Sequence, residues 1–211
     1  MTIGFTVNGR QVSVAAQGDA PLLDVLRNHL DLKGTRYGCG LEQCGSCMVL
    51  LDGEPVYACT RQVGTVAGRA VTTVEGLGSA GALHPLQQAF LKHQAGQCGY
   101  CLSGILIAAA GLLGRQPDPS RFEILQALEP NLCRCGAHNR IVRAVQRAAA
   151  AMRSMPSSTN LPHAELSGEA GPRSTQDGGA SFEAPLRAAP QDTEVGDTSA
   201  GMVASGERAG P

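Results

Sequence analysis

The sequence predicts an α+β protein in which a β-rich segment, residues 1–77, precedes an all-helical segment, residues 82–153, and a disordered acidic tail, residues 154–211. Apolar residues alternate in short runs in the first segment and recur at helical spacing in the second. They give way to Gly, Pro, Ser and Ala in the third, which buries too little apolar surface to fold. We therefore expect two folded domains, joined by the small-residue stretch 76–81.

Two turn dipeptides organise the β-rich segment. Strands are expected at residues 3–7, 11–14, 48–51, 56–58 and 71–74. Asn8-Gly9 joins the first two runs and Asp52-Gly53 joins the next two, and both dipeptides favour the type I′ turn of a β-hairpin. The segment is therefore expected to contain two hairpins and a closing strand.

Helix signals appear once in the first segment and repeatedly in the second. An early helix is expected to begin near Pro21, with Asp19 as its cap. Later helices are expected at residues 84–93, 102–113, 120–128 and 139–151. Ser120 and Asn139 stand at the N-cap positions of the last two. The helix 102–113 is apolar nearly all round, which places it at the buried centre of a small bundle.

Composition and charge exclude several classes of function. The chain has 211 residues and a net charge of −1, without the basic runs expected of a nucleic-acid-binding protein. No apolar stretch reaches the roughly 18 residues that span a bilayer. No secretory signal is visible at the N-terminus, so we expect a cytoplasmic protein, with export beside a signal-bearing partner as the alternative. Nucleotide-binding fingerprints and hydrolytic triads are absent from the sequence.

The eight cysteines fall into two sets of four. They read Cys39-x4-Cys44-x2-Cys47-x11-Cys59 and Cys98-x2-Cys101-x31-Cys133-x-Cys135. Disulfides are disfavoured without a secretory signal. Zinc sites are usually built from two short Cys-x-x-Cys hooks, and each set has only one. The first spacing matches the ligand pattern of plant-type [2Fe–2S] ferredoxins.

Glycines and helix starts support an anionic cluster at each set. Gly38, Gly40 and Gly45 allow the first loop to turn tightly and free its peptide N–H groups to approach cluster sulfurs. In the second set, each cysteine pair precedes a predicted helix, whose N-terminus favours negative charge. Spacing alone makes the second set a metal site without naming the metal.

These motifs resemble a known family. Gly-Cys-Gly-x3-Cys-Gly-x-Cys, Gln97-Cys98-Gly99-Tyr100-Cys101 and Asn131-Leu132-Cys133-Arg134-Cys135 are similar to the two-cluster iron–sulfur subunit of molybdenum hydroxylases, the xanthine oxidase and aldehyde oxidoreductase family. The resemblance covers roughly residues 3 to 152. Residues 133–140 look most like the small subunits of nicotinate dehydrogenase and isoquinoline oxidoreductase. The resemblance implies a β-grasp, plant-type ferredoxin-like domain followed by a four-helix bundle.

The resemblance also implies a division of labour. The cluster on Cys39, Cys44, Cys47 and Cys59 would be the distal one, and the cluster on Cys98, Cys101, Cys133 and Cys135 would lie near a molybdopterin held by a large partner subunit. Gln97 would hydrogen-bond the pterin, with Cys135 beside it. Electrons would leave through the second and then the first cluster to a flavin subunit or a cytochrome c, while the partner hydroxylates a heteroaromatic ring or an aldehyde. A stand-alone ferredoxin-like carrier or redox sensor is the alternative.

Overall fold

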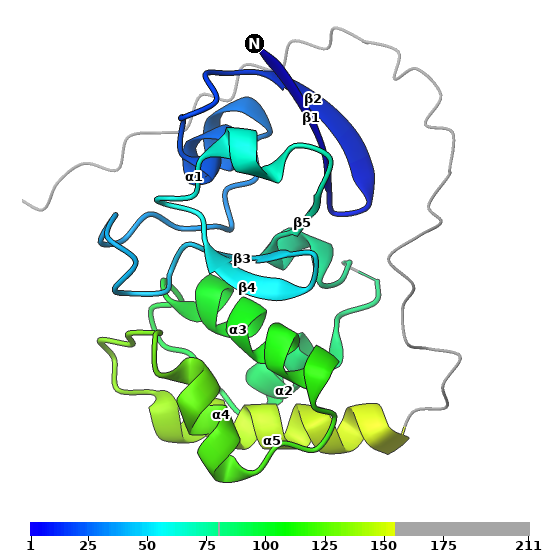
Figure 1. Cartoon of the computed structure of the whole chain (residues 1–211). Helices are drawn as coiled ribbons and strands as arrows, with labels where there is room; N and C mark the ends of the chain where they lie inside the picture. The colour runs from blue at the N-terminus through cyan, green and yellow to red at the C-terminus, as the bar shows by residue number, and fades with distance from the viewer. Residues whose placement is uncertain (80, 155–211) are drawn as a thin grey trace, which may run out of the picture. The chain divides into compact units, whose positions relative to one another are not determined.

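The β-rich segment forms a five-stranded mixed sheet. The computed structural model describes residues 1–79 and 81–154, so the predicted tail lies outside the described residues except for Ser154. The strands are β1 (Thr2–Val7), β2 (Arg10–Ala15), β3 (Met48–Leu51), β4 (Glu54–Tyr57) and β5 (Ala70–Thr72). They lie in the order β2-β1-β5-β3-β4 (Figure 1). Strands β1 and β5 are parallel, and the other neighbouring pairs are antiparallel.

Both predicted hairpins are confirmed. Strand β1 pairs with β2 and strand β3 pairs with β4, each across a two-residue turn. In the first turn φ is 49° at Asn8 and 78° at Gly9, and in the second it is 51° at Asp52 and 89° at Gly53. Positive φ at both central residues is the condition for the type I′ turn.

The early helix begins where expected, but its predicted cap is wrong. It consists of α1 (Leu22–Asp24) followed by a π-helical turn (Val25–His29), and its N-cap is Pro21, which makes no side-chain cap bond. The first peptide N–H groups donate instead to carbonyls of the segment after β4. Leu22 N–H donates to Arg61 O at 2.7 Å, and Leu23 N–H donates to Ala58 O at 2.9 Å. A tertiary contact therefore satisfies the donors that a side-chain cap at Asp19 was expected to satisfy.

A short 3₁₀ helix (Val74–Gly76) and then four α-helices follow the sheet in the described residues. The α-helices are α2 (Pro85–Lys92), α3 (Leu102–Arg115), α4 (Arg121–Leu128) and α5 (His138–Ser154). Ser120 caps α4 as predicted, in a capping box with Glu123. Asn139 does not cap α5, because the helix starts one residue earlier, and the carbonyl of Ala137 accepts the N–H of Ile141. Asn139 therefore lies in the first turn of the helix.

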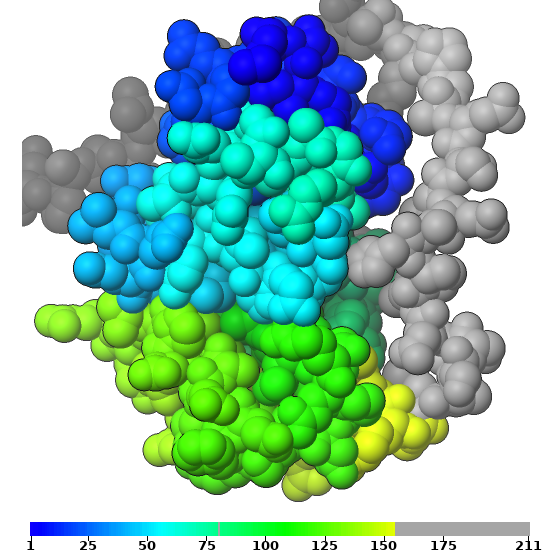
Figure 2. Space-filling view, in the orientation of Figure 1, coloured from blue at the N-terminus to red at the C-terminus, as the bar shows by residue number. Residues whose placement is uncertain are grey.

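Strand β3 is buried on both faces and contributes to two hydrophobic cores. Val49 and Leu51 pack with α1 and strands β1 and β5. Met48 and Leu50 face the other way and join the core formed by the helices. Helix α3 lies along this second face of the sheet, as the central green helix of Figure 1 shows, and Figure 2 shows the helical surface directly adjoining the sheet. No helix in the described part of the chain is long and apolar enough to cross a membrane.

A half-buried imidazole caps α2. Nδ1 of His84 accepts the N–H of Leu86 at 3.2 Å, while Oε1 of Gln87 accepts the N–H of His84 at 2.9 Å. Burial lowers the pKa of His84 below its ordinary value of 6.5. The unfolded chain therefore binds a proton at a higher pH than the folded chain. The resulting contribution to the free energy of unfolding is present above about pH 6.5 and is lost as the pH falls through the folded pKa.

Replacing His84 tests this cap. His84→Ala is expected to lower the free energy of unfolding by about 1 kcal/mol near neutral pH, because the cap is lost. The difference from the wild type should shrink in acid, where the protonated imidazole no longer accepts the bond. Urea unfolding across the pH range measures both effects. His84→Asn, which keeps a capping oxygen without the titration, should retain most of its stability in acid. A constant difference between wild type and His84→Ala would contradict the prediction.

Candidate functional site

The structure gathers the first four cysteines as two pairs. Cys39 and Cys44 lie on the loop before β3 with their thiols in hydrogen-bonding contact. Cys47 ends this loop, and its thiol contacts that of Cys59, which follows β4. Cys47 and Cys59 are buried, while Cys39 and Cys44 are half-buried. The hairpin formed by β3 and β4 therefore returns the fourth cysteine to the loop that carries the other three.

Peptide N–H groups surround the thiols of Cys39 and Cys44. Leu41 and Gln43 donate to Sγ of Cys39 at 3.3 and 3.2 Å, and Cys39 N–H donates to Sγ of Cys44 at 3.3 Å. Partial burial opposes ionisation of Cys39, but these donors dominate and hold its pKa at about 7 rather than the ordinary 9.0. Such N–H···S bonds stabilise negative charge and raise the reduction potential of a cluster bound there.

All three predicted glycines are required by this geometry. A Cβ atom at Gly38 would lie 2.5 Å from Sγ of Cys44 and would fill the space that the sulfur occupies. Gly45 has φ of +69°, and a Cβ there would lie 2.3 Å from Nδ2 of Asn131. Gly40 likewise has φ of +71°. The loop fits a cluster because side chains are missing where sulfur and peptide groups approach each other.

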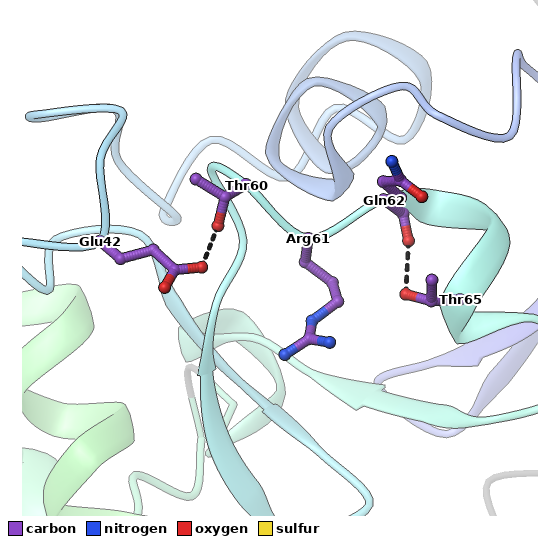
Figure 3. A pocket seen from close by; sticks show the side chains of 5 residues that line it. All are labelled: Glu42, Thr60, Arg61, Gln62 and Thr65. Atoms are coloured by element: carbon purple, nitrogen blue, oxygen red, sulfur yellow. Dashed lines mark hydrogen bonds between the residues drawn. The ribbon is translucent and has the colours of Figure 1, made fainter.

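A shallow polar cavity of about 290 Å³ borders the first cysteine set (Figure 3). Its lining residues are Glu42, Thr60, Arg61, Gln62 and Thr65. The hydroxyl of Thr60 donates to the carboxylate of Glu42, as the dashed line in Figure 3 shows. Glu42 belongs to the cysteine loop and Thr60 directly follows Cys59, so this bond fastens the loop to the segment that supplies the fourth thiol.

The second four cysteines also meet as two pairs. The thiols of Cys98 and Cys135 are in contact, as are those of Cys101 and Cys133. Cys101 is the N-cap residue of α3, and Cys135 lies just before α5, so both pairs stand at helix starts as predicted. The N–H of Tyr100 and the thiol of Cys135 lower the pKa of Cys98.

In each set, one buried cysteine needs a nearby cation in order to ionise at neutral pH. Burial raises the pKa of Cys47 and of Cys101 to about 12, so without a cation both stay neutral thiols. A bound iron would supply the positive charge that a buried thiolate needs.

The paired arrangement of the thiols bears on the kind of metal site that each set could form. A structural zinc site brings four ligands to one point. Among residues 1–79 and 81–154, no three His, Cys, Asp or Glu side chains converge closely enough to hold one ion. A [2Fe–2S] cluster with four cysteines places two thiolates on each iron. Two thiol pairs in each set therefore fit a two-iron cluster, with one pair for each iron.

Gln97 lies next to Cys135, the other residue predicted to face a pterin. The side-chain Nε2 of Gln97 donates to the carbonyl of Cys135 at 3.2 Å. Gln97 is exposed, and Cys135 is half-buried. The residues expected to contact the partner's cofactor thus share one edge of the second cysteine set.

Asn131 acquires a place in the site that its position in the sequence motif did not predict. Its side chain is only 2% exposed and reaches the first cysteine loop, where Nδ2 donates to Gly45 O at 3.3 Å. The two residues are 86 positions apart in the chain. The sequence signal is an amide two residues before a cysteine pair, which does not by itself reveal a contact with the other cysteine set.

Family models match both the β-rich and the helical segment of the chain. A model described as a 2Fe-2S iron–sulfur cluster binding domain matches residues 5–70, and one described as a [2Fe-2S] binding domain matches residues 73–146. Two clusters of this type are therefore the cofactors of the chain. The matched ranges contain the first and the second cysteine set respectively.

This chain matches two relatives over nearly their whole length and a longer solved structure over a part of its length. A nicotinate dehydrogenase subunit of Pseudomonas putida is 53% identical over 148 residues, which is 70% of this chain and 94% of that protein. The alpha subunit of isoquinoline 1-oxidoreductase from Brevundimonas diminuta is 49% identical over 70% of this chain and 97% of its own length. The solved structure of aldehyde oxidoreductase from Desulfovibrio gigas matches with a TM-score of 0.70 and 41% identity. That match covers 72% of this chain and 17% of the much longer oxidoreductase chain.

The relatives confirm the family and the subfamily that the cysteine motifs predicted, and they confirm an oxidoreductase subunit that transfers electrons. The chain belongs to the iron–sulfur subunits of the molybdenum hydroxylases.

Proposed function

We propose that this chain carries single electrons from a molybdopterin centre in a large partner subunit to a flavin subunit or a cytochrome c. The observation that carries the proposal is the gathering of eight cysteines into two sets of paired thiols on loops that touch each other. Cys98, Cys101, Cys133 and Cys135 would hold the cluster nearer the partner, and Cys39, Cys44, Cys47 and Cys59 the outer one. The clusters supply one-electron chemistry when bound.

The residues of this chain have definable tasks in that role. Gln97 would present its amide to the pterin while its bond to the Cys135 carbonyl fixes its orientation. The N–H groups around Cys39 would favour the reduced outer cluster. Gly38, Gly40 and Gly45 would keep the loop close to the sulfurs.

We propose a domain division that follows the cysteine sets. Residues 1–77 would form a β-grasp, ferredoxin-like domain, and residues 82–153 a four-helix bundle of α2 to α5. The two hydrophobic cores and the two family-model ranges support this division. Ligation of two clusters would use all eight cysteines as thiolates, which favours a cytoplasmic location, with export alongside a partner that bears a signal as the alternative.

The proposed substrate class rests on the names of the nicotinate dehydrogenase and isoquinoline 1-oxidoreductase subunits. Nicotinate and isoquinoline are both nitrogen heteroaromatics. We therefore propose that the partner hydroxylates a heteroaromatic ring carbon, using oxygen from water, with aldehydes as the second class.

Co-production of the full chain with its large partner tests the proposal. Iron, molybdenum and acid-labile sulfide are counted on the purified complex, and electron paramagnetic resonance follows reduction by dithionite and by nicotinate or isoquinoline. We expect two distinct cluster signals, both of which a heteroaromatic substrate also produces. A chain that holds both clusters yet binds no molybdenum-containing partner would be a stand-alone carrier. Zinc in place of iron at the second set would overturn the two-cluster assignment.

A further inference from the structure

Besides the bond from Asn131 to Gly45, three hydrogen bonds in the described residues join the neighbourhoods of the two cysteine sets. The hydroxyl of Tyr100 donates to the carbonyl of Tyr37. Oγ of Ser103 donates to the carbonyl of Ser46 at 3.3 Å. The N–H of Leu132 donates to the carbonyl of Cys44 at 3.0 Å. Each bond connects the neighbourhood of a cysteine in the first set with that of a cysteine in the second.

The bond between Leu132 and Cys44 is the most direct of the three. Its acceptor is the carbonyl of a cysteine in the first set, and its donor is the residue directly before Cys133 in the second. The link between these cysteines therefore consists of main chain and one hydrogen bond. The other two links each pass through a side-chain hydroxyl and at least one further residue. Electron tunnelling decays steeply with distance and less steeply through bonds than through space, so the main-chain link is favoured.

Asn131 holds this link in place. Its side chain is 2% exposed, and Nδ2 donates to Gly45 O at 3.3 Å and lies 3.6 Å from Sδ of Met48. Gly45 follows Cys44, and Asn131 precedes Leu132, so the side-chain bond runs beside the main-chain bond. The amide orientation is fixed, because turning it over would set Oδ1 against the Gly45 carbonyl.

Packing alone does not require an amide at this position. Oδ1 of Asn131 is buried and has no hydrogen-bond partner among residues 1–79 and 81–154. A buried acceptor without a partner lowers stability, whereas an apolar side chain of similar size leaves nothing unpaired. Gly45 O would keep a partner without the amide, because it also accepts the N–H of Met48 at 3.2 Å. The amide therefore serves the alignment of the two loops.

We propose that Asn131 is a positioning residue for electron transfer between the two clusters. It aligns the Leu132 N–H with the Cys44 carbonyl and so sets the coupling between the cysteine sets. This inference rests on the proposed function. In each transfer one electron passes from the reduced second cluster to the oxidised first cluster, and no bond forms and no proton moves. The reductant is the partner's molybdenum centre in turnover and dithionite in the test.

The test compares Asn131→Leu with the wild type in the full chain. Both proteins are reduced with dithionite, and low-temperature electron paramagnetic resonance measures the magnetic splitting between the two reduced clusters. Rapid partial reduction measures the rate of electron exchange between them. We expect the variant to keep its iron and its melting temperature, to show a smaller splitting, because the through-bond part is lost, and to exchange electrons more slowly by about tenfold or more. An unchanged splitting and rate, with iron retained, would overturn the proposal.

Two further variants keep the test decisive. Ser103→Ala removes a buried hydrogen bond from the first turn of α3 to the same first cysteine loop, and it should leave splitting and rate unchanged. An equal effect of Ser103→Ala would overturn the assignment to Asn131. Asn131→Ala serves if leucine prevents folding, and it should give the same loss. A wild-type chain that lacks a second iron cluster would refute the proposed function itself, which is a different result from an unaltered variant.

Discussion

Cys47→Ser is expected to remove the outer cluster, which the first four cysteines hold, and to leave the cluster nearer the partner. Cys47 is 1% exposed, and its thiol contacts Cys59, so serine deprives a buried iron of a ligand that water cannot replace. The iron content should fall by about half, and one of the two paramagnetic signals should disappear. In the complex, substrate should still reduce the molybdenum and the cluster nearer the partner. Turnover with the terminal acceptor should fall by more than about a hundredfold.

Ser46→Ala is the matched control for this variant. It lies one residue away in the same loop, is also buried, and keeps the carbonyl that Ser103 uses. Iron content and turnover should be those of the wild type. If Cys47→Ser turned over normally with half of the iron, the outer position of the first cluster would be wrong.

Gly104→Ala is expected to destabilise the chain strongly, although alanine normally favours a helix. Gly104 lies in the first turns of α3, and a Cβ there would lie 1.8 Å from Gly45 O and 3.1 Å from the Cα of Ser46. The obstructing atoms are main chain of the cysteine loop, so relief requires the two halves to separate. We expect a loss of about 3 kcal/mol in the free energy of unfolding, measured by urea denaturation, together with lost iron.

The same helix supplies the control. Gly114 is also in α3, and apart from its own helical turn no atom of the described residues lies within 4 Å of a Cβ built there. Gly114→Ala should raise the free energy of unfolding by up to about 1 kcal/mol, because alanine has the higher helix propensity. Similar unfolding midpoints for the two variants would show that α3 does not press against the cysteine loop.

The elements that the sequence predicted best are those with local causes. Asn8-Gly9 and Asp52-Gly53 fix their turns through their own backbone angles, and Ser120 caps its helix through residues three positions away. Of the two predicted caps that failed, the one at Asn139 missed by a single position in the chain, whereas the one at Asp19 failed because a distant group supplies the partner. Asp19 does not cap the first helix, because carbonyls of the segment after β4 accept those N–H groups.

The cysteine sets could be predicted from spacing, because short loops carry most of their members. Their internal pairing could not, since Cys59 and Cys135 reach their partners only through the fold. The contact of Asn131 with the first cysteine loop could not be predicted for the same reason. Its contacts are long-range, and a buried asparagine before a cysteine pair has no local signature of its target.

Strand β3 couples the folding of the sheet to the folding of the helices. Leu51 belongs to the core of the sheet, while Leu50 belongs to the core of the helices, so neither core is complete without this strand. Loss of the helices would expose Met48 and Leu50 to water, and loss of the sheet would remove part of the wall against which α3 packs. The halves should therefore unfold together in one cooperative transition despite their separate cores.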